Sequence, residues 1–150
     1  MLFRSLAGLT LLARRELSEA QVRQRLARRG YPEEEIDEAA ARLKAERAID
    51  DARTAGAIAR TETSVKRHGR LRVRRQIEQA GIAPSIAKAA LDEVFEHVDN
   101  DAMLEAALDR RLRDQATIPD DRTFQRLYRY LVGQGFESER VLRLLTARRR

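Results

Sequence analysis

A run of basic side chains in the middle of the sequence is the group of residues best suited to bind a charged partner. The stretch KRHGRLRVRR carries six cations, which are Lys66, Arg67, Arg70, Arg72, Arg74 and Arg75. From residue 60 to residue 75 there are seven basic residues and one acid, and the difference of +6 equals the net charge of the whole chain. Arginine pairs in a forked geometry with phosphate and carboxylate oxygens. The sequence therefore predicts a binding patch formed by these six residues.

A solvated helix face is the alternative interpretation of this run of charge. At helical spacing Val73, Ile77 and Ala80 share one inward face, so the arginines are distributed over the rest of the circumference. The basic stretch also spans the end of one expected helix, a turn and the start of the next helix, which favours a single patch. We interpret the patch as a contact surface, and its spacing leaves open whether the partner is DNA phosphate or an acidic protein surface.

The rest of the sequence lacks the side-chain groupings that catalysis or cofactor binding requires. There is no GxxxxGK or GxGxxG phosphate-binding motif and no cysteine. Acidic clusters at 33–35, 50–51 and 120–121 fall at expected helix starts, where capping and the helix macrodipole explain them. His68 is expected near a helix C-terminus. We therefore expect a non-enzymatic protein with no cofactor, no metal and no small-molecule substrate.

Composition and internal repetition indicate an all-α fold. The 150 residues include only seven glycines and three prolines, and aromatic residues make up 5%. An aliphatic residue, a second one four positions later and a glycine four positions after that recur as Val22–Leu26–Gly30, Val73–Ile77–Gly81 and Leu127–Leu131–Gly135. Each glycine is expected in the left-handed conformation that ends a helix, with the following Tyr31, Ile82 or Phe136 folding back on the last turn.

A further helix is expected before each of these helix–turn–helix pairs, at about 2–15, 51–66 and 101–114. The prediction is thus three tandem three-helix repeats, residues 1–50, 51–98 (the basic one) and 99–150, forming an elongated, curved, solenoid-like molecule. No stretch reaches the roughly 20 apolar residues of a membrane span. We interpret the apolar N-terminal stretch as the first helix rather than as a signal segment, and we expect a cytoplasmic protein without membrane contact.

Three longer stretches resemble the RecX family, whose members regulate the RecA recombinase. They are LLARRELSEAQVRQRLARRGYPEEEIDEAAARLKAERAIDD, KRHGRLRVRRQIEQAGI and LYRYLVGQGFESERVLRLL, and they occur in the family's order over nearly the whole chain. Two positions depart from the family pattern. Thr54 and Ala55 stand where an aromatic residue is usual, and Gly69–Arg70 stands in place of a Gly–Pro pair.

The resemblance implies a regulator that binds the RecA–DNA filament, lies along its groove and restrains its ATPase and strand exchange. It also implies weak binding to single- or double-stranded DNA alone. A free-standing helical DNA-binding regulator is the alternative, because two helices joined by a turn can form a helix-turn-helix. Only one of the three pairs is strongly basic, which argues against this alternative. A third alternative is a scaffold without a nucleic-acid role, in which the basic patch would bind no partner.

Overall fold

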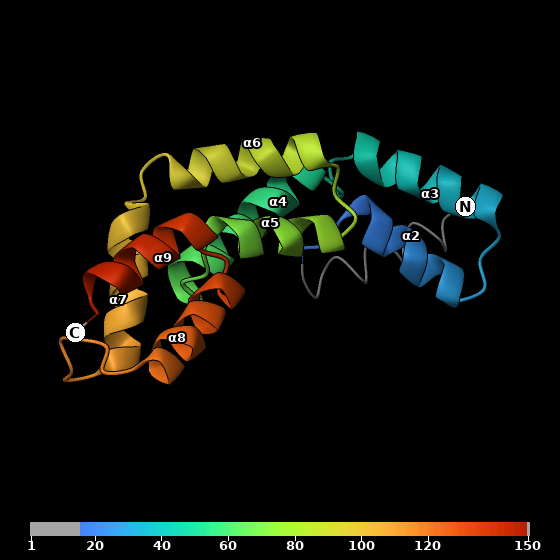
Figure 1. Ribbon diagram of the computed structural model, residues 1–150. Coiled ribbons are helices and arrows are strands. Elements are labelled where there is room, and N and C mark those ends of the chain that lie inside the picture. Colours follow the sequence, from blue (N-terminus) through green and yellow to red (C-terminus); the bar gives the residue numbers. More distant parts are fainter. Residues whose placement is uncertain (1–15, 150) are drawn as a thin grey trace. The chain divides into compact units, whose positions relative to one another are not determined.

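The computed structural model describes residues 16–149, and the regular elements of this part are helices with one isolated β-bridge, between Ile118 and Arg149. The expected all-α fold is confirmed (Figure 1). None of the helices in this range is long and apolar enough to cross a membrane. The helix expected at 2–15 lies outside the described residues. The elements are α2 (Glu19–Arg28), α3 (Glu33–Ala45), α4 (Asp51–Arg60), a π-helical turn η1 (Thr61–Val65), α5 (Arg70–Gln79), α6 (Pro84–Phe95), α7 (Asn100–Leu112), α8 (Asp121–Gly133) and α9 (Ser138–Ala147).

The described residues form two compact units. The first consists of 16–58 with 76–90, and the second of 59–75 with 91–149. Helices α4, α5 and α6, which make up the expected middle repeat, therefore contribute residues to both units.

The core of the first unit lies in the hairpin formed by α2 and α3 (Figure 1). Apolar residues at helical spacing face each other across the hairpin, and burying them is the main force that holds the two short helices together. The buried residues of this cluster are Leu17, Val22, Leu26, Ile36, Ala39, Leu43 and Ile49.

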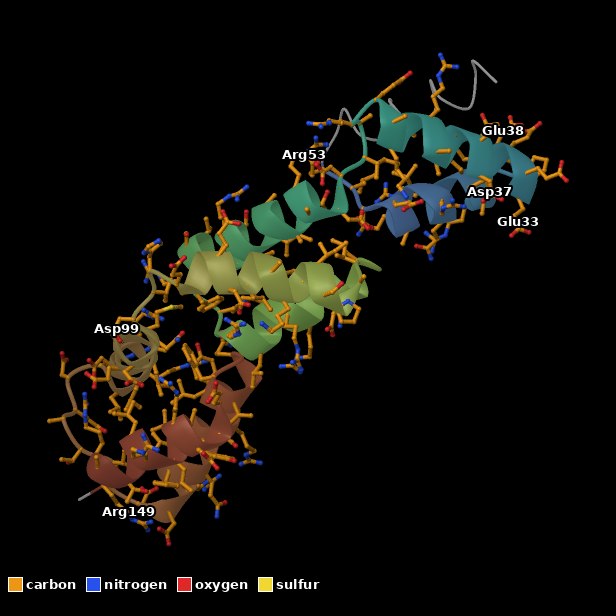
Figure 2. The ribbon with its side chains drawn as sticks, turned by 90° about the horizontal axis from the view of Figure 1, so that it is seen from above. Glu33, Asp37, Glu38, Arg53, Asp99 and Arg149 are labelled. Atoms are coloured by element: carbon orange, nitrogen blue, oxygen red, sulfur yellow. The ribbon has the colours of Figure 1, made fainter. Side chains whose placement is uncertain are left out.

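Thr54, on α4, lies in the first unit. It is buried, and its hydroxyl is within 3.4 Å of the carbonyl of Leu17 and 3.3 Å of the carboxylate of Glu16. Arg53, labelled in Figure 2, pairs with the same carboxylate at 2.7 Å. Polar contacts thus connect α4 to the segment before α2.

The core of the second unit lies among α7, α8 and α9, which pack on one another. The predicted stripe of α7 is buried as expected, with Leu104, Ala107, Leu108 and Leu112 all at 6% exposure or less. The other buried members of this cluster are Ile118, Leu127, Leu131, Phe136, Val141 and Leu145.

The three glycine turns have the predicted conformation. Gly30, Gly81 and Gly135 have φ angles of 90°, 79° and 102°. The amide after the glycine bonds back to the helix in two of them, from Tyr31 to the Leu26 carbonyl and from Phe136 to the Leu131 carbonyl, each at 3.3 Å. These are the bonds of a Schellman motif, in which a residue without a Cβ takes the left-handed conformation at least cost.

Acidic residues cap α4, α7 and α8 as the sequence predicts. The cluster at 33–35 does not cap α3, which has Pro32 as its N-cap, but lies in the first turn, where negative charge suits the helix macrodipole. Asp99, at the start of α7 in Figure 2, accepts from the amide of Ala102 at 3.0 Å, and Asp120 accepts from that of Thr123 at 2.7 Å. Of the pair expected at the start of α4, Asp50 is the cap and accepts from the amide of Arg53 at 3.1 Å, while Asp51 lies in the first turn. The carboxylate of Asp51 accepts from the amide of Glu19, at 2.9 Å, and so satisfies a free N–H at the start of α2.

Ser18 connects the start of α2 to the glycine turn between α5 and α6. Its hydroxyl accepts from the amide of Gln21, whose side chain accepts from the amide of Ser18 in return, so the two form a capping box. The same hydroxyl donates to the carbonyl of Ala80. A Cβ on Gly81 would lie 2.4 Å from the Cβ of Ala20, so only glycine fits there.

Candidate partner-binding surface

The basic residues lie on the segment that joins α4 to α5 and on the first turns of α5, all within the second unit. Helix α4 does not end at Arg60 but widens into the π-helical turn η1, and Lys66 follows as its C-cap. Arg67 then adopts a φ of 58°, which a residue with a side chain rarely takes. This left-handed residue reverses the chain direction before α5 begins at Arg70.

The buried carboxylate of Glu62 holds residues 66–68 in place. Glu62 in η1 is only 5% exposed and lies 2.9 Å from Nζ of Lys66 and 2.5 Å from Nδ1 of His68. An ionised carboxylate can only accept, so Nδ1 of His68 carries the proton that is donated. The amide of His68 also donates to the carbonyl of Glu62, at 2.9 Å. Three contacts thus hold Lys66 and His68, the residues on both sides of Arg67, in place.

The environment of Glu62 has opposing effects on its pKa. Burial raises the pKa, while hydrogen bonds from Lys66 and His68 and their charge lower it, and the net result is a pKa below the ordinary value of glutamate. The carboxylate therefore stays ionised at neutral pH although it is buried.

The start of α5 is fixed by the glycine turn between α8 and α9. The amide of Gly69 donates to the carbonyl of Gln134 at 2.8 Å, and the amide of Leu71 donates to the carbonyl of Gly135 at 3.1 Å. The guanidinium of Arg72 donates to the carbonyl of Gly133 at 3.3 Å. Free N–H groups of one helix start are thereby paired with free C=O groups of another helix end.

The six predicted cations differ in how far they are already bonded within the protein. Lys66 pairs with Glu62, Arg72 bonds to the α8–α9 turn, and Arg74, although exposed, also has an interaction partner. Arg70 is half-buried: it forms an ion pair of 2.5 Å with Asp92 and lies 5.8 Å from the centre of the Phe95 ring.

Arg67 and Arg75 are the two cations of the six that are exposed and form no salt bridge with another described residue. They lie on either side of the fixed start of α5. Lys66 and Arg70, by contrast, are already paired within the protein, because Glu62 and Asp92 fold against them. Val73, Ile77 and Ala80 are buried, which confirms the predicted inward face of α5.

Sequence reasoning missed both acidic partners and the role of His68. Glu62 lies four residues before Lys66, a spacing that favours an ion pair, so a local signal for it was present. Asp92 is 22 residues away from Arg70 in the sequence, and no local pattern links them. His68 was expected to act at a helix C-terminus through its charge, but the structure places it in a buried hydrogen bond to Glu62. Within residues 16–149 no group of three or more potential ligands is placed to hold a metal ion.

Family models and known protein sequences were compared with this chain, and both show similarity to RecX proteins. Residues 6–43 match the model described as RecX, first three-helix domain, and residues 50–91 match the model described as RecX, second three-helix domain. The chain is 32% identical over 133 residues to the regulatory protein RecX of Syntrophotalea carbinolica, covering 88% of this chain and 87% of that protein. It is 31% identical to the regulatory protein RecX of Halorhodospira halophila, covering 90% and 81%.

Solved structures show a similar fold. The crystal structure of RecX from Lactobacillus salivarius superposes with a TM-score of 0.71 at 20% identity, over 96% of this chain and 95% of that chain. A crystal structure of regulatory protein RecX also gives a TM-score of 0.71, at 21% identity, over 96% and 72%. At these identities the structural likeness concerns the fold alone.

Proposed function

Because this chain belongs to the RecX family of regulatory proteins, we propose that it binds a filament of the RecA recombinase on DNA and restrains its ATPase and strand exchange. In this proposal the protein is a non-enzymatic, cytoplasmic regulator of recombination and DNA repair. Its three tandem repeats, 1–50, 51–98 and 99–150, would let one molecule contact more than one protomer, since the described α-helices of 10–13 residues each extend about 15–20 Å.

The placement of the charge is the observation that best supports this proposal. The whole net charge of the chain lies in residues 60–75, and the first turn of α5 is fixed by backbone bonds to the α8–α9 turn. Arg67 and Arg75 project from this fixed segment with no salt bridge to another described residue. Because the backbone of this segment is already fixed, a phosphate or a carboxylate has to order only the arginine side chains, which lowers the entropic cost of binding.

Titration of the recombinase ATPase on single-stranded DNA tests the proposed function. We expect this protein to suppress ATP hydrolysis at less than one copy per recombinase protomer, and to slow strand exchange in parallel. The double variant Arg67→Gln with Arg75→Gln should inhibit less, whereas Arg110→Gln, which removes an exposed arginine of α7, should inhibit like the parent. If an excess of the folded parent protein leaves both activities unchanged, the function is wrong.

The order of affinities separates this proposal from a free-standing DNA-binding regulator. A protein that recognises the filament should bind it more tightly than bare single-stranded or duplex DNA by about tenfold or more, which corresponds to about 1.4 kcal/mol. A free-standing regulator should bind duplex DNA at least as tightly as the filament. Fluorescence anisotropy with labelled DNA, with and without recombinase, measures all three affinities.

A further inference from the structure

Helix α8 carries three arginines in a row on its outer face. Arg122, Arg126 and Arg129 fall within an arc of about 60° on the helix and extend along it for about 10 Å. Leu127 and Leu131, on the other side of α8, are buried in the core of the second unit. All three arginines are exposed. These three residues, the arginine row, therefore face solvent.

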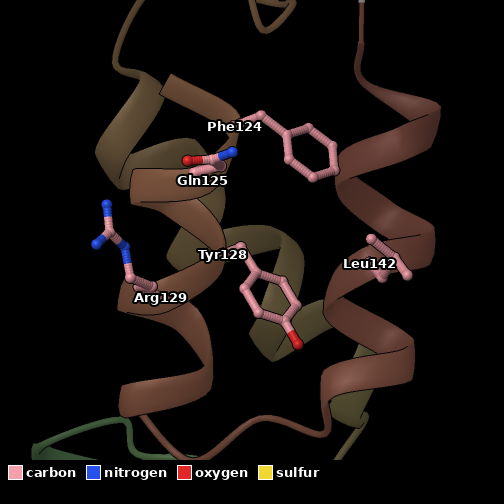
Figure 3. A pocket seen from close by; sticks show the side chains of 5 residues that line it. All are labelled: Phe124, Gln125, Tyr128, Arg129 and Leu142. Atoms are coloured by element: carbon pink, nitrogen blue, oxygen red, sulfur yellow. The ribbon is translucent and has the colours of Figure 1, made fainter. Parts of the chain in front are cut away.

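Two aromatic rings of α8 point in a different direction from the arginine row. In Figure 3, Phe124 and Tyr128 reach from α8 toward α9, where they line a pocket together with Leu142. Arg129 also borders this pocket, but its guanidinium points away from α9 in the same view. The charged row and the apolar pocket are therefore separate features of the helix.

The arginine row is not neutralised by acids of its own segment. Residues 122–136 contain no aspartate or glutamate, and none of the three arginines forms a salt bridge with another described residue. Two acids precede the row. Asp121 pairs with Arg149, and Asp120, whose charge interacts with two of the arginines, caps α8 by accepting from the amide of Thr123 at 2.7 Å. One carboxylate thus lies near three guanidinium groups, which leaves an excess of positive charge.

The arginine row continues toward the start of α5, which belongs to the same unit. Gly133 takes the next position in the arc, and a Cβ there would have no described atom within 4 Å, so this face of the helix is open. The guanidinium of Arg72 donates to the carbonyl of Gly133 at 3.3 Å. A fourth guanidinium group is therefore held at the C-terminal end of the row.

We propose that the arginine row binds the phosphate backbone of double-stranded DNA, with the three arginines of α8 and Arg72 each placed against a phosphate. Guanidinium groups pair in a forked geometry with phosphate oxygens, and contacts to the backbone require no particular base sequence. A protein partner fits less well. Protein interfaces are anchored by apolar and aromatic side chains in desolvated pockets, and the row itself contains no apolar side chain.

A duplex fits the row better than a single strand does. Proteins that bind single strands stack the bases on aromatic side chains. Phe124 and Tyr128 are turned toward α9, and the guanidinium of Arg111 lies over the ring of Tyr130, 3.7 Å from its centre. These rings of α8 therefore do not offer bases a free face. A duplex carries about twice as many phosphate charges per unit length as one strand and requires no stacking.

Binding of duplex DNA to the full-length protein tests the arginine row. The inference goes beyond the proposed function and does not depend on it, so the test uses DNA without recombinase. Anisotropy of a fluorescein-labelled duplex of about 20 base pairs, about two helical turns, is measured at several salt concentrations. The triple variant Arg122→Gln, Arg126→Gln, Arg129→Gln keeps the helix propensity of α8. It should bind about tenfold more weakly or worse, and the slope of log affinity against log salt should become shallower by about 2.7, since each lost contact contributes about 0.9.

A second triple variant controls for the loss of net charge. Arg28→Gln, Arg29→Gln, Arg47→Gln removes three exposed arginines at opposite ends of the α2–α3 hairpin, none of which forms a salt bridge with another described residue. The salt slope of this control should differ from that of the parent by less than one contact, about 0.9. Equal losses of affinity and slope in the two triple variants would mean that the duplex responds to net charge alone, and would overturn the proposal.

Backbone amide NMR shifts of the parent protein locate the bound duplex. We expect the shifts to change in residues 122–133, and circular dichroism should show that both triple variants are folded. The proposal is overturned if the parent does not bind the duplex, if it binds a single strand of the same length as tightly, or if residues 122–133 show no change. The proposed function would stand in each of these cases, because filament binding is measured separately.

Discussion

Gly69 and Gly135 lie backbone against backbone, and neither position has room for a side chain. A Cβ on Gly69 would lie 2.6 Å from the carbonyl carbon and oxygen of Gly135, and a Cβ on Gly135 would lie 2.6 Å from the carbonyl oxygen of Gly69. The first unit contains a related contact, in which the start of α2 meets the turn at Gly81 through Ser18 and Ala20. In both units, therefore, the second helix of one repeat begins on the glycine turn of the next repeat.

Substitution of Gly69 by alanine should destabilise the protein strongly. The added methyl group would overlap with backbone atoms of the α8–α9 turn, which cannot move without breaking the bonds to Gly69 and Leu71. We expect a loss of about 3 kcal/mol, the upper part of the range for overpacking. Urea denaturation followed by circular dichroism measures it.

Two other glycines provide the controls for this prediction. Gly30→Ala should cost only about 1 kcal/mol, because φ is 90° but no described atom lies within 4 Å of the added Cβ. Gly133→Ala should leave stability unchanged or slightly raised, because Gly133 is helical and open. If Gly69→Ala and Gly30→Ala lowered the free energy of unfolding equally, the close approach of Gly69 to Gly135 would add no cost to the substitution.

The glycine turns and helix faces could be predicted from the sequence because they depend on local rules. A glycine after an aliphatic pair at helical spacing predicts a left-handed helix end, and Gly30, Gly81 and Gly135 have that conformation. The buried stripes of α5 and α7 follow from helical periodicity alone. These features depend on neighbours within a few residues.

Which of the basic residues are engaged within the fold could not be predicted from the sequence, because it depends on contacts between distant segments. Asp92 reaches Arg70 only after α5 and α6 have folded, and Arg72 meets Gly133 across 61 positions of sequence. The start of α8 also differs from the repeat pattern. Thr123 occupies the repeat position of Ser18 and Gly69, but α8 begins about one turn earlier, after the N-cap Asp120. The added turn places Thr123 inside the helix.

Replacement of Ser18 by alanine should lower the free energy of unfolding by about 2 kcal/mol. The variant loses the N-cap of α2, worth about 1 kcal/mol. It also leaves the buried carbonyl of Ala80 without the hydroxyl that donates to it. Asp99→Ala provides the comparison, because Asp99 caps α7 at an exposed site. Thermal unfolding of both variants should show the larger decrease in Tm for Ser18→Ala.

Acid should destabilise the protein partly through Glu62. The folded pKa of Glu62 is lowered, so the unfolded chain binds a proton more readily than the folded chain does. The stability that Glu62 contributes is therefore complete above the unfolded value of about 4.3 and is lost as the pH falls below it, through the folded pKa. Urea midpoints measured from neutral pH down into this range should decrease.

The variant Glu62→Gln isolates this contribution. It should be less stable than the parent at pH 7 by about 1–2 kcal/mol, because Lys66 and His68 lose a charged hydrogen-bond acceptor. The difference between parent and variant should shrink as the pH falls, since the parent loses its own carboxylate charge. A difference that stays constant down to low pH would contradict the assigned role of Glu62.

The double variant Arg67→Gln with Arg75→Gln should weaken binding without unfolding the protein. Both side chains are exposed and form no salt bridge with another described residue, whereas Arg70 and Arg72 also hold α5 in place. If both arginines meet DNA phosphates, the slope of log affinity against log salt should become shallower by about 1.4 for single-stranded DNA or about 1.8 for duplex DNA, since each contact contributes about 0.7 or 0.9. If they meet recombinase carboxylates instead, affinity for the filament should fall while the weak affinity for bare DNA stays the same. Binding curves at several salt concentrations distinguish the two outcomes, with circular dichroism as the folding control. A folded double variant that binds filament and DNA like the parent would show that Arg67 and Arg75 belong to a solvated face.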